Sequence, residues 1–545
     1  MAMKVAPGSV RPRRARRSAA FSSWCLGVVA LTAAGAALSV SDPGAPEAAP
    51  QVRVRTGVLQ GVTEASSRVT AYKGIPYAKP PTGELRWRPP VPAPDWEGVR
   101  DAREFGHACL QPPQQPTGLY SGGMASPSED CLTLNVWTPI GARRLPVMVW
   151  IHGGALVGGS SSEPMYDGVK IAERGVVVVS INYRLGLLGY LAHPALSAES
   201  PQRLSGNYGL LDQIEALRWV RDNIAALGGD PRQVTIAGES AGGLSVRSQL
   251  VSPGARGLFA HAIVESGAYA ETVPTLAQAE AVGEGLAAKM GCASQTAACL
   301  RSLPVSTLLA NETALSQLPN IASVLPEQYG AAFATGDFAH VPVLSGSNHD
   351  EWMLFVDLLN SQLGNPVTAA NYQAQIAATL QLPSPALAAP IAAAYPLADY
   401  ATPYNALGAV GTDAIFACNA RADVRSISQY APTYQYEFAD PSPPLVFQLP
   451  PVPYSLGAYH ASELQFLFPQ PVSALDGGEQ QLASAMQGYW TNFAKRGDPN
   501  GPGLPAWPSY TAAADTAQAL VPPTPSPETT FAAAHTCALW AAAGG

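Results

Sequence analysis

The stretch "VTIAGESAGG" (residues 234–243) joins a strand-like run to a cluster of small residues around one serine. Val234, Thr235 and Ile236 are β-branched and favour a buried strand. The glycines two positions to either side of Ser240 permit a tight turn from strand into helix, which leaves the serine hydroxyl exposed on strained backbone. Because the chain contains 50 glycines, this pentapeptide alone is weak evidence for a nucleophile. The rest of the chain decides its meaning.

The segments on both sides of this turn alternate between strand and helix patterns. Continuous apolar runs are typical of a parallel sheet that is covered on both faces, and residues 210–231 carry a helical apolar stripe that ends at two glycines. The pattern predicts an α/β fold with one large, mostly parallel central sheet flanked by helices and no clean domain boundary. The expected strands are 145–154, 175–184, 234–236, 261–266, 340–346 and 433–439, and residues 52–62 read as an edge hairpin.

Composition excludes several classes of protein. The 545 residues are 47% hydrophobic, which is enough for a large core. Only 13% are charged and the net charge is −8, so a disordered chain, a nucleic-acid partner and an anionic membrane partner are all disfavoured.

The first 37 residues read as a secretory signal peptide, followed by a Pro/Ala linker over 38–50. Six basic residues and no acidic residue precede an apolar run of about 15 residues and a small-residue cleavage site near Ala36 or Ala37. The paired arginines fit a twin-arginine export signal. The alternative is a membrane anchor, but the run is shorter than the roughly 20 residues that span a bilayer. We therefore expect a secreted or periplasmic protein.

The cysteines agree with export. One of the seven, Cys25, lies in the signal segment, and an even number remains, which suggests disulfides in an exported chain. Six cysteines allow 15 pairings, and their spacing does not choose among them. A zinc site is disfavoured because no C-x-x-C occurs.

A nucleophilic serine needs an acid and a base further along the chain. In an α/β sheet of this kind the order is serine, acid, histidine. The segment "VPVLSGSNHDEW" (341–352) places Asp350 and Glu351 just after a strand-like run, and the residues alone leave the choice between them open.

Two histidines follow these acids, His460 and His535. His535 lies ten residues from the end and beside a cysteine, whereas His460 stands in a loop that opens an apolar segment. We therefore favour His460 as the base.

The oxyanion donors also have a candidate. The stretch "WIHGGALVGGS" (150–160) is a strand that ends in glycines, as in H-G-G oxyanion loops, and the amide of Ala241 follows the nucleophile. A phosphate-binding loop is the weaker alternative, because no G-x-x-x-x-G-K-[ST] motif is present.

At this point the chain resembles the type-B carboxylesterases, the α/β-hydrolase family that includes cholinesterases and bacterial carboxylesterases. The resemblance covers nearly all of residues 52–541. The motifs that carry it are "YKGIPYAKPPTGELRWRPP" (72–90), "SEDCLTLNVWTP" (128–139), "WIHGGAL" (150–156), "SEPMYDG" (162–168), "INYRLGLLGYL" (181–191), the run 206–243, "GSNHDE" (346–351), "YHASEL" (459–464) and "FAKRGDPN" (493–500).

The resemblance implies one α/β-hydrolase domain over residues 51–541 and a role for each site residue. It implies the nucleophile Ser240, the acid Glu351 rather than Asp350, and the base His460. It implies oxyanion amides at Gly154, Ala155 and Ala241. It implies the disulfides Cys109–Cys131, Cys292–Cys299 and Cys418–Cys537. Two positions depart from the family pattern: Ala155 stands where a third glycine is common, and Trp352 follows the acid where glycine is common, which leaves the shape of the pocket open.

The sequence thus predicts an exported serine carboxylesterase that hydrolyses neutral esters through a Ser-Glu-His triad and an acyl-enzyme, with no metal or organic cofactor. The expected partner is a small-molecule ester, with no nucleic acid and no stable membrane association; the oligomeric state stays open. The resemblance implies a preference for neutral esters over choline esters. In cholinesterases the loop closed by the first disulfide carries a tryptophan that binds the quaternary ammonium, whereas the loop between Cys109 and Cys131 contains no tryptophan here and its one aromatic residue is Tyr120. The alternatives are a lipase for longer-chain lipid esters and a non-catalytic binding module.

Overall fold

The computed structural model describes residues 49–113, 124–312, 318–322, 324–361, 363–469 and 474–542. Ala49–Gly545 form one compact unit. The expected signal segment, most of the expected linker and Tyr120 lie outside the described residues.

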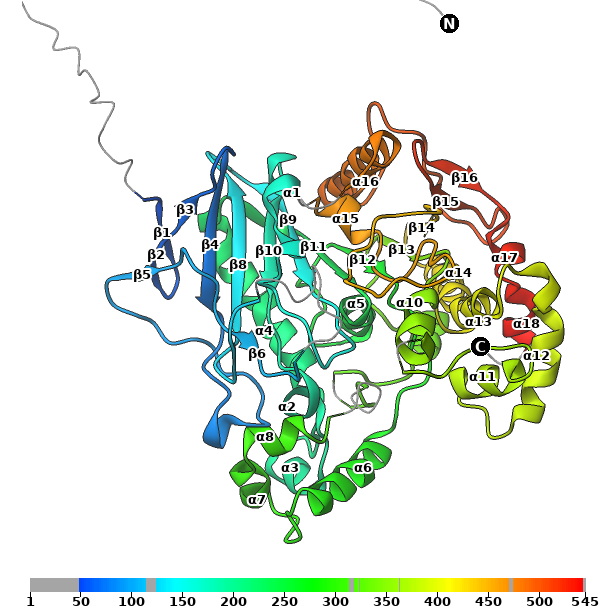
Figure 1. The fold of residues 1–545 in the computed structure, drawn as a ribbon. Helices are drawn as coiled ribbons and strands as arrows, with labels where there is room; N and C mark the ends of the chain where they lie inside the picture. The colour runs from blue at the N-terminus through cyan, green and yellow to red at the C-terminus, as the bar shows by residue number, and fades with distance from the viewer. Residues whose placement is uncertain are drawn as a thin grey trace, which may run out of the picture. The chain divides into compact units, whose positions relative to one another are not determined.

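The strands form one 11-stranded sheet of order β16-β15-β14-β13-β12-β11-β9-β10-β8-β4-β3, one three-stranded sheet of order β1-β2-β5, and the pair β6-β7 (Figure 1). The central strands from β10 to β15 pair in parallel, and the edges of the large sheet are antiparallel. The expected large, mostly parallel sheet is confirmed. The strand bounds are β1 Gln51–Val54, β2 Gly57–Gln60, β3 Val62–Thr63, β4 Val69–Pro76, β5 Val99–Asp101, β6 Ala108–Cys109, β7 Pro127–Ser128, β8 Thr133–Pro139, β9 Leu145–Ile151, β10 Val177–Ile181, β11 Gly229–Glu239, β12 His261–Glu265, β13 Val343–Asn348, β14 Thr433–Phe438, β15 Ala517–Leu520 and β16 Ser526–Glu528.

Most of the helices lie between these strands in the chain, and α17 and α18 follow the last strand. Their bounds are α1 Val169–Glu173, α2 Gly186–Tyr190, α3 Pro194–Glu199, α4 Tyr208–Asn223, α5 Ala241–Val251, α6 Leu276–Lys289, α7 Ala297–Ser302, α8 Val305–Leu309, α9 Tyr329–Thr335, α10 Met353–Val356, α11 Tyr372–Thr379, α12 Ala389–Ala394, α13 Pro403–Gly411, α14 Cys418–Ile427, α15 Leu464–Leu467, α16 Gly477–Arg496, α17 Phe531–Ala534 and α18 Cys537–Ala542.

Strand β9 shows why the central strands are apolar along their whole length. Val147, Val149 and Ile151 belong to one hydrophobic core, and the alternate residues Met148 and Trp150 belong to another. Successive side chains of a strand point to opposite faces. Both faces of the sheet are therefore buried, and an unbroken apolar run is required.

Helices cover each face. The first core contains residues of α4, α5 and α9, and the second contains residues of α1, α15 and α16. In Figure 1, α4 and α5 are seen on one side of the central strands and α16 on the other. The parallel strands share one direction, so their carboxyl ends all lie along the same side of the sheet. A layer of helices covers each face.

Two local expectations are refined by the structure. The segment 52–62 does form a hairpin, in which Val54 pairs with Gly57, but β1 and β2 belong to the separate three-stranded sheet and not to the edge of the central one. The strand before the acid runs from Val343 to Asn348, because its ladder with β14 continues to Asn348↔Phe438.

The three disulfides expected from the resemblance are all present. They join Cys109 to Cys131, Cys292 to Cys299 and Cys418 to Cys537. The last of them ties α18 to the start of α14. His535 lies next to this tie, held between Asp413 and Glu437.

Candidate active site

Ser240 stands at the junction between β11 and α5. Its backbone has φ 56° and ψ −119°, a left-handed φ that is rare for a residue with a side chain. The N–H of Ser240 donates to the carbonyl oxygen of Glu265 at 2.9 Å, which fastens the turn to the neighbouring strand β12. The structure thus has the strained strand-to-helix turn that the sequence predicts.

The two glycines of the pentapeptide are required by close packing. A Cβ at Gly238 would lie 2.6 Å from the carbonyl oxygen of Ile151 and 2.6 Å from the carbonyl carbon of Gly242. A Cβ at Gly242 would overlap the same Ile151 oxygen. Helix α5 can therefore pack against β9 only when both positions lack a side chain.

The neighbouring strands β11, β12 and β13 end at the same edge of the sheet. Ser240 follows β11, Ser266 follows β12 and Glu351 lies three residues beyond β13. Ligands of open α/β sheets bind outside the carboxyl ends of the strands. This edge is therefore where a site is expected.

The structure brings Glu351 and His460 into direct contact. The Nδ1 atom of His460 lies 2.6 Å from Oε2 of Glu351, and the Glu351 side chain is fully buried. The other oxygen, Oε1, accepts from the Ser266 hydroxyl at 2.5 Å and from the Asn348 N–H at 2.8 Å. An Nδ1–H that donates to Glu351 leaves Nε2 of the neutral imidazole as an acceptor.

Asp350 faces another way. Its Oδ2 accepts from the N–H of Ala458 at 3.0 Å and lies 3.2 Å from Nδ1 of His349. The N–H of Asp350 donates to the carbonyl of Ala458 at 3.1 Å. Asp350 therefore joins the loop after β13 to the loop that carries His460.

Nε2 of His460 lies 3.3 Å from Oε1 of Glu239, the residue before Ser240. Within the described part of the chain, no hydrogen bond joins the Ser240 hydroxyl to His460. Nucleophile–base distances in ligand-free active sites are often loose. Burial lowers the pKa of His460, but the carboxylates of Glu239 and Glu351 outweigh it and raise this pKa above its usual value.

Two further buried acids lie behind this group. Burial raises the pKa of Glu265 to about 8, and burial also holds the pKa of Glu463 well above its usual range. Trp490 donates to Glu265 at 2.8 Å, and the Asn348 amide donates to Glu463 at 2.5 Å. Both acids therefore favour the protonated form more than a solvent-exposed glutamate does, and each accepts a hydrogen bond from a neighbouring side chain.

The three expected oxyanion donors lie in the loop after β9 and at the start of α5. Gly154 and Ala155 have φ values of 102° and 54°, in the loop after β9. Ala241 is the first residue of α5, where an N–H has no partner within the helix. In the part of the chain that the structure describes, none of these three N–H groups donates to a protein acceptor.

His152 holds the start of this loop. Its ring stacks on Tyr183 with centroids 4.5 Å apart, and Nδ1 lies 2.9 Å from the carbonyl oxygen of Gly153. Burial lowers the pKa of His152 to about 4, so the imidazole is neutral and supports the loop by packing.

The sequence reasoning missed Ser266, Asn348 and the contact of Glu239 with His460. Ser266 could have been predicted. It follows β12, which lies between the strands that precede Ser240 and Glu351, and polar residues at the ends of adjacent parallel strands converge. The sequence contains no sign of the Glu239–His460 contact, because that contact depends on the path of a loop more than 200 residues further along the chain.

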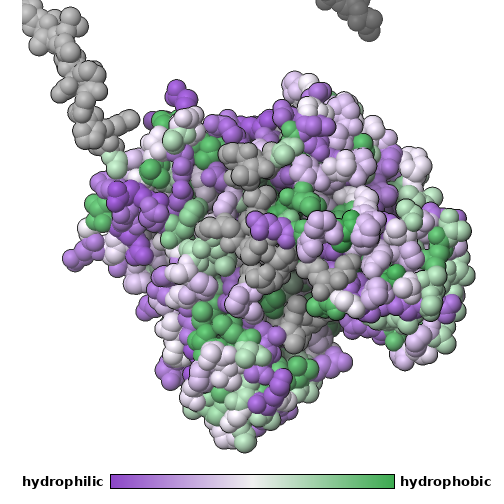
Figure 2. All heavy atoms as spheres, in the orientation of Figure 1, coloured by the Kyte–Doolittle hydropathy of each residue, from purple (hydrophilic) through white to green (hydrophobic). Residues whose placement is uncertain are grey.

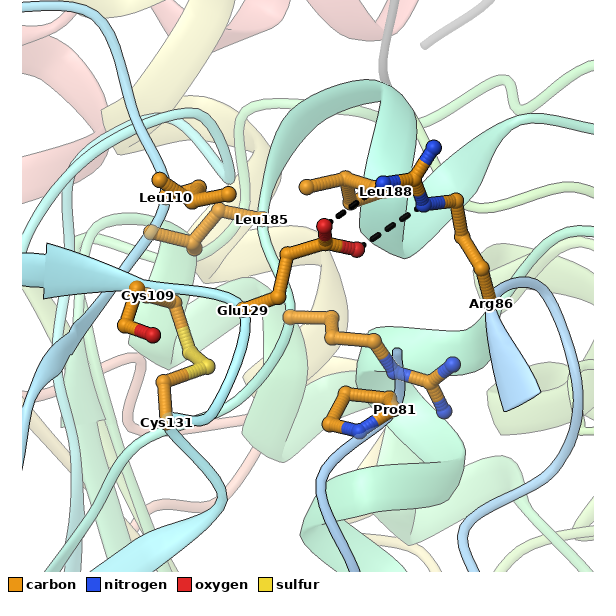
Figure 3. A pocket seen from close by; sticks show the side chains of 10 residues that line it. Pro81, Arg86, Cys109, Leu110, Glu129, Cys131, Leu185 and Leu188 are labelled. Carbon is orange, nitrogen blue, oxygen red and sulfur yellow. Dashed lines mark hydrogen bonds and ion pairs between the residues drawn. A yellow bond between two sulfur atoms is a disulfide. The ribbon is translucent and has the colours of Figure 1, made fainter. Parts of the chain in front are cut away.

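A cavity of about 10 Å³, room for about one water, lies beside the Cys109–Cys131 disulfide (Figure 3). It is lined by the ion pair of Arg86 and Glu129, which is joined by two hydrogen bonds of 2.8 and 2.6 Å. None of the expected catalytic residues lines this cavity.

Among the described residues, no group of three or more His, Cys, Asp or Glu side chains is placed so that it could hold a metal ion. No helix in the described ranges combines the length and the apolar character needed to cross a bilayer.

Comparison with known proteins gives one family and many relatives. The model of the carboxylesterase family matches residues 48–540. The fumonisin B1 esterase of Sphingopyxis macrogoltabida is 35% identical over 91% of this chain and 89% of its own length. The para-nitrobenzyl esterase of Bacillus subtilis is 37% identical over 84% and 92%. The human cocaine esterase is 35% identical over 87% and 88%.

Proposed function

We propose a Ser-Glu-His mechanism for this chain, which belongs to the carboxylesterase family and is a carboxylic ester hydrolase with the α/β-hydrolase fold. In this proposal Ser240 is the nucleophile, His460 the general base and Glu351 the acid that orients it. Gly154, Ala155 and Ala241 supply the oxyanion amides.

The steps follow from the roles of these groups. Nε2 of His460 takes the proton of Ser240 as the hydroxyl oxygen attacks the ester carbonyl. Glu351 fixes the Nδ1–H tautomer and stabilises the imidazolium that forms. The amides hold the oxyanion, each worth about 2.7–4 kcal/mol in the transition state. His460 then protonates the leaving alcohol, and water attacks the acyl-enzyme by the same route.

The observation that carries this proposal is the 2.6 Å contact between His460 and a fully buried Glu351. It lies at the sheet edge that also holds the strained Ser240 turn and three unbonded amides. These features are what acyl transfer requires. Loss of hydrolysis on substitution of Ser240, with the fold retained, is the direct test.

The two carboxylates beside His460 predict a shift in the pH profile. Glu239 is the larger of the two charge contributions that raise the pKa of His460. Glu239→Gln removes this charge, so the pKa of His460 falls. Because the base must be neutral, the acid limb of kcat/KM moves to lower pH.

The measurement is kcat/KM against pH for wild type, Glu239→Gln and the control Glu280→Gln. Glu280 accepts from Ser197 in another part of the molecule. An acid limb that stays in place, or moves to higher pH, in Glu239→Gln contradicts the assignment of His460 as the base.

We further propose that the substrates are neutral esters. A cation over a tryptophan face gains about 0.5–2 kcal/mol, and the loop between Cys109 and Cys131 contains no tryptophan. We expect kcat/KM for butyrylthiocholine to be no better than for a neutral thioester of equal acyl length. Turnover of the choline thioester about tenfold faster would show that another group binds the cation.

Export of the mature protein is the third part of the proposal. Three disulfides support an oxidising compartment, and the basic, acid-free start of the chain supports a cleaved signal. The intact mass of the exported protein, before and after reduction, is expected to show cleavage after about residue 36 and three disulfides. A mass that retains residues 1–30, or free thiols, overturns it.

A lipase for longer-chain lipid esters is the alternative. Such an enzyme needs a broad apolar surface near its site. On the face that Figure 2 draws, the coloured apolar residues lie among hydrophilic ones. Activity against acyl chain length, measured below and above substrate solubility, separates the two. An activity jump above the solubility limit would favour the lipase.

A further inference from the structure

Two phenylalanines pack on the ring of His460. The ring centroids of Phe355 and Phe416 each lie 5.2 Å from that of the imidazole. Their own centroids are 6.1 Å apart with the planes 18° from parallel. Phe355 is half-buried and Phe416 is buried. Both rings therefore border the imidazole that serves as the base in the proposed mechanism.

Trp352 lies behind both phenylalanines. Its ring centroid is 4.6 Å from that of Phe355 and 6.4 Å from that of Phe416. We call Trp352, Phe355 and Phe416 the aromatic wall. The wall comes from two segments far apart in sequence, α10 with the residue before it and the segment after α13; α10 and α13 are in contact (Figure 1).

The indole of Trp352 is held from the other side. A Cβ at Gly411, the last residue of α13, would overlap the indole ring, so the absence of a side chain there lets the ring seat. The backbone N–H of Trp352 donates a hydrogen bond to the Thr412 hydroxyl at 3.0 Å. Trp352 thus fills the space between α13 and the phenylalanines that contact His460.

The backbone around the wall is unusual as well. Thr412–Ala417, which carries Phe416, is π-helical, and so is Asp357–Ser361, which follows α10. Short π-helical segments inside helices are rare and occur frequently at functional sites. Both segments that carry the wall therefore have the backbone irregularity expected near a site.

We propose that Trp352 is a positioning residue that sets, through Phe355 and Phe416, how much room the substrate has beside His460. The inference rests on the proposed triad, because His460 must face the bond that breaks. In this proposal Trp352 acts only through other residues. It supports Phe355 and Phe416, and these two rings limit the size of the acyl or alcohol part of the ester that fits beside His460.

The test compares Trp352→Ala and Trp352→Phe with wild type on two ester series. One series varies the acyl group from acetyl to a branched or aromatic acid with a constant alcohol; the other varies the alcohol with a constant acyl group. Pocket changes of a methylene or two are worth about 10–200-fold in kcat/KM. We expect Trp352→Ala to raise the bulky-to-small ratio at least about tenfold in one series, and Trp352→Phe to stay near wild type.

The matched control is Trp96→Ala. Trp96 donates to the Val58 carbonyl and packs on Gly57, beside the three-stranded sheet. Its loss is expected to change kcat/KM by the same factor for all esters of both series. A uniform change in both series for Trp352→Ala, or equal effects of the alanine and phenylalanine variants, overturns the inference.

Gly411→Ala provides a second test from the opposite side. The new methyl group presses on the indole, and we expect it to lower the ratio for bulky esters in wild type and to leave it unchanged when Trp352 is already alanine. Equal effects in the two backgrounds contradict the coupling. Should Gly411→Ala not fold, the Trp352 variants decide alone. Activity that survives Ser240→Ala would instead overturn the proposed function.

Discussion

Ser240→Ala is expected to lower kcat for ester hydrolysis by about 10⁶-fold while the protein stays folded. The turn brings the residue to the carboxyl end of β11 with φ 56°, and alanine accepts this backbone at a cost similar to that of serine. The free energy of unfolding should therefore change little. The oxyanion amides remain, so residual rates about 10³–10⁴-fold above water are compatible with the expectation.

The control for this variant is Ser248→Ala on the same helix. Ser248 is fully buried and bonds to Leu244 and Tyr329, so its loss tests the helix without touching the nucleophile. Steady-state kinetics and thermal unfolding of both variants are the measurements. A Ser240→Ala enzyme that stays folded and keeps a tenth or so of wild-type kcat would exclude Ser240 as the nucleophile.

Glu351→Gln is expected to lower kcat by about 10⁴-fold. The neutral amide that replaces the carboxylate no longer stabilises the imidazolium and favours the wrong tautomer of His460. The amide also disturbs the hydrogen bonds that Ser266 and Asn348 donate to the Glu351 carboxylate in the wild-type protein. The loss should fall mainly on kcat.

Asp350→Asn is the matched control, one residue away and equally conservative. Its carboxylate contacts the Ala458 N–H and His349, not the imidazole of His460. We expect a far smaller loss of kcat than for Glu351→Gln. If the ranking is reversed, Asp350 orients the base and the proposed acid is wrong.

The sequence predicted the central sheet because its signals are local. Runs such as residues 145–151 are apolar at every position, and that is what a strand buried on both faces demands. The Gly238 and Gly242 spacing likewise reports a close approach of backbone that no other residue allows. These features can be recognised without knowing the partner segment.

The contacts across the site could not be predicted in this way. Asp350 and Glu351 are adjacent and both follow the strand, so only the resemblance chose between them. Which carboxylate contacts His460 depends on how the two loops are joined, and the hydrogen bonds between Asp350 and Ala458 join them. The second carboxylate on the histidine, Glu239, and the wall of Phe355 and Phe416 depend on the same long-range packing.

The measurement that tests the central claim most directly is covalent labelling with an organophosphonate ester, followed by peptide mass mapping of the inactivated enzyme. The reagent phosphonylates an activated serine and leaves unactivated hydroxyls unmodified. The account predicts one adduct per chain, on the peptide that contains Ser240, with loss of activity in proportion to labelling. Stoichiometric inactivation with the adduct on any other residue would contradict it.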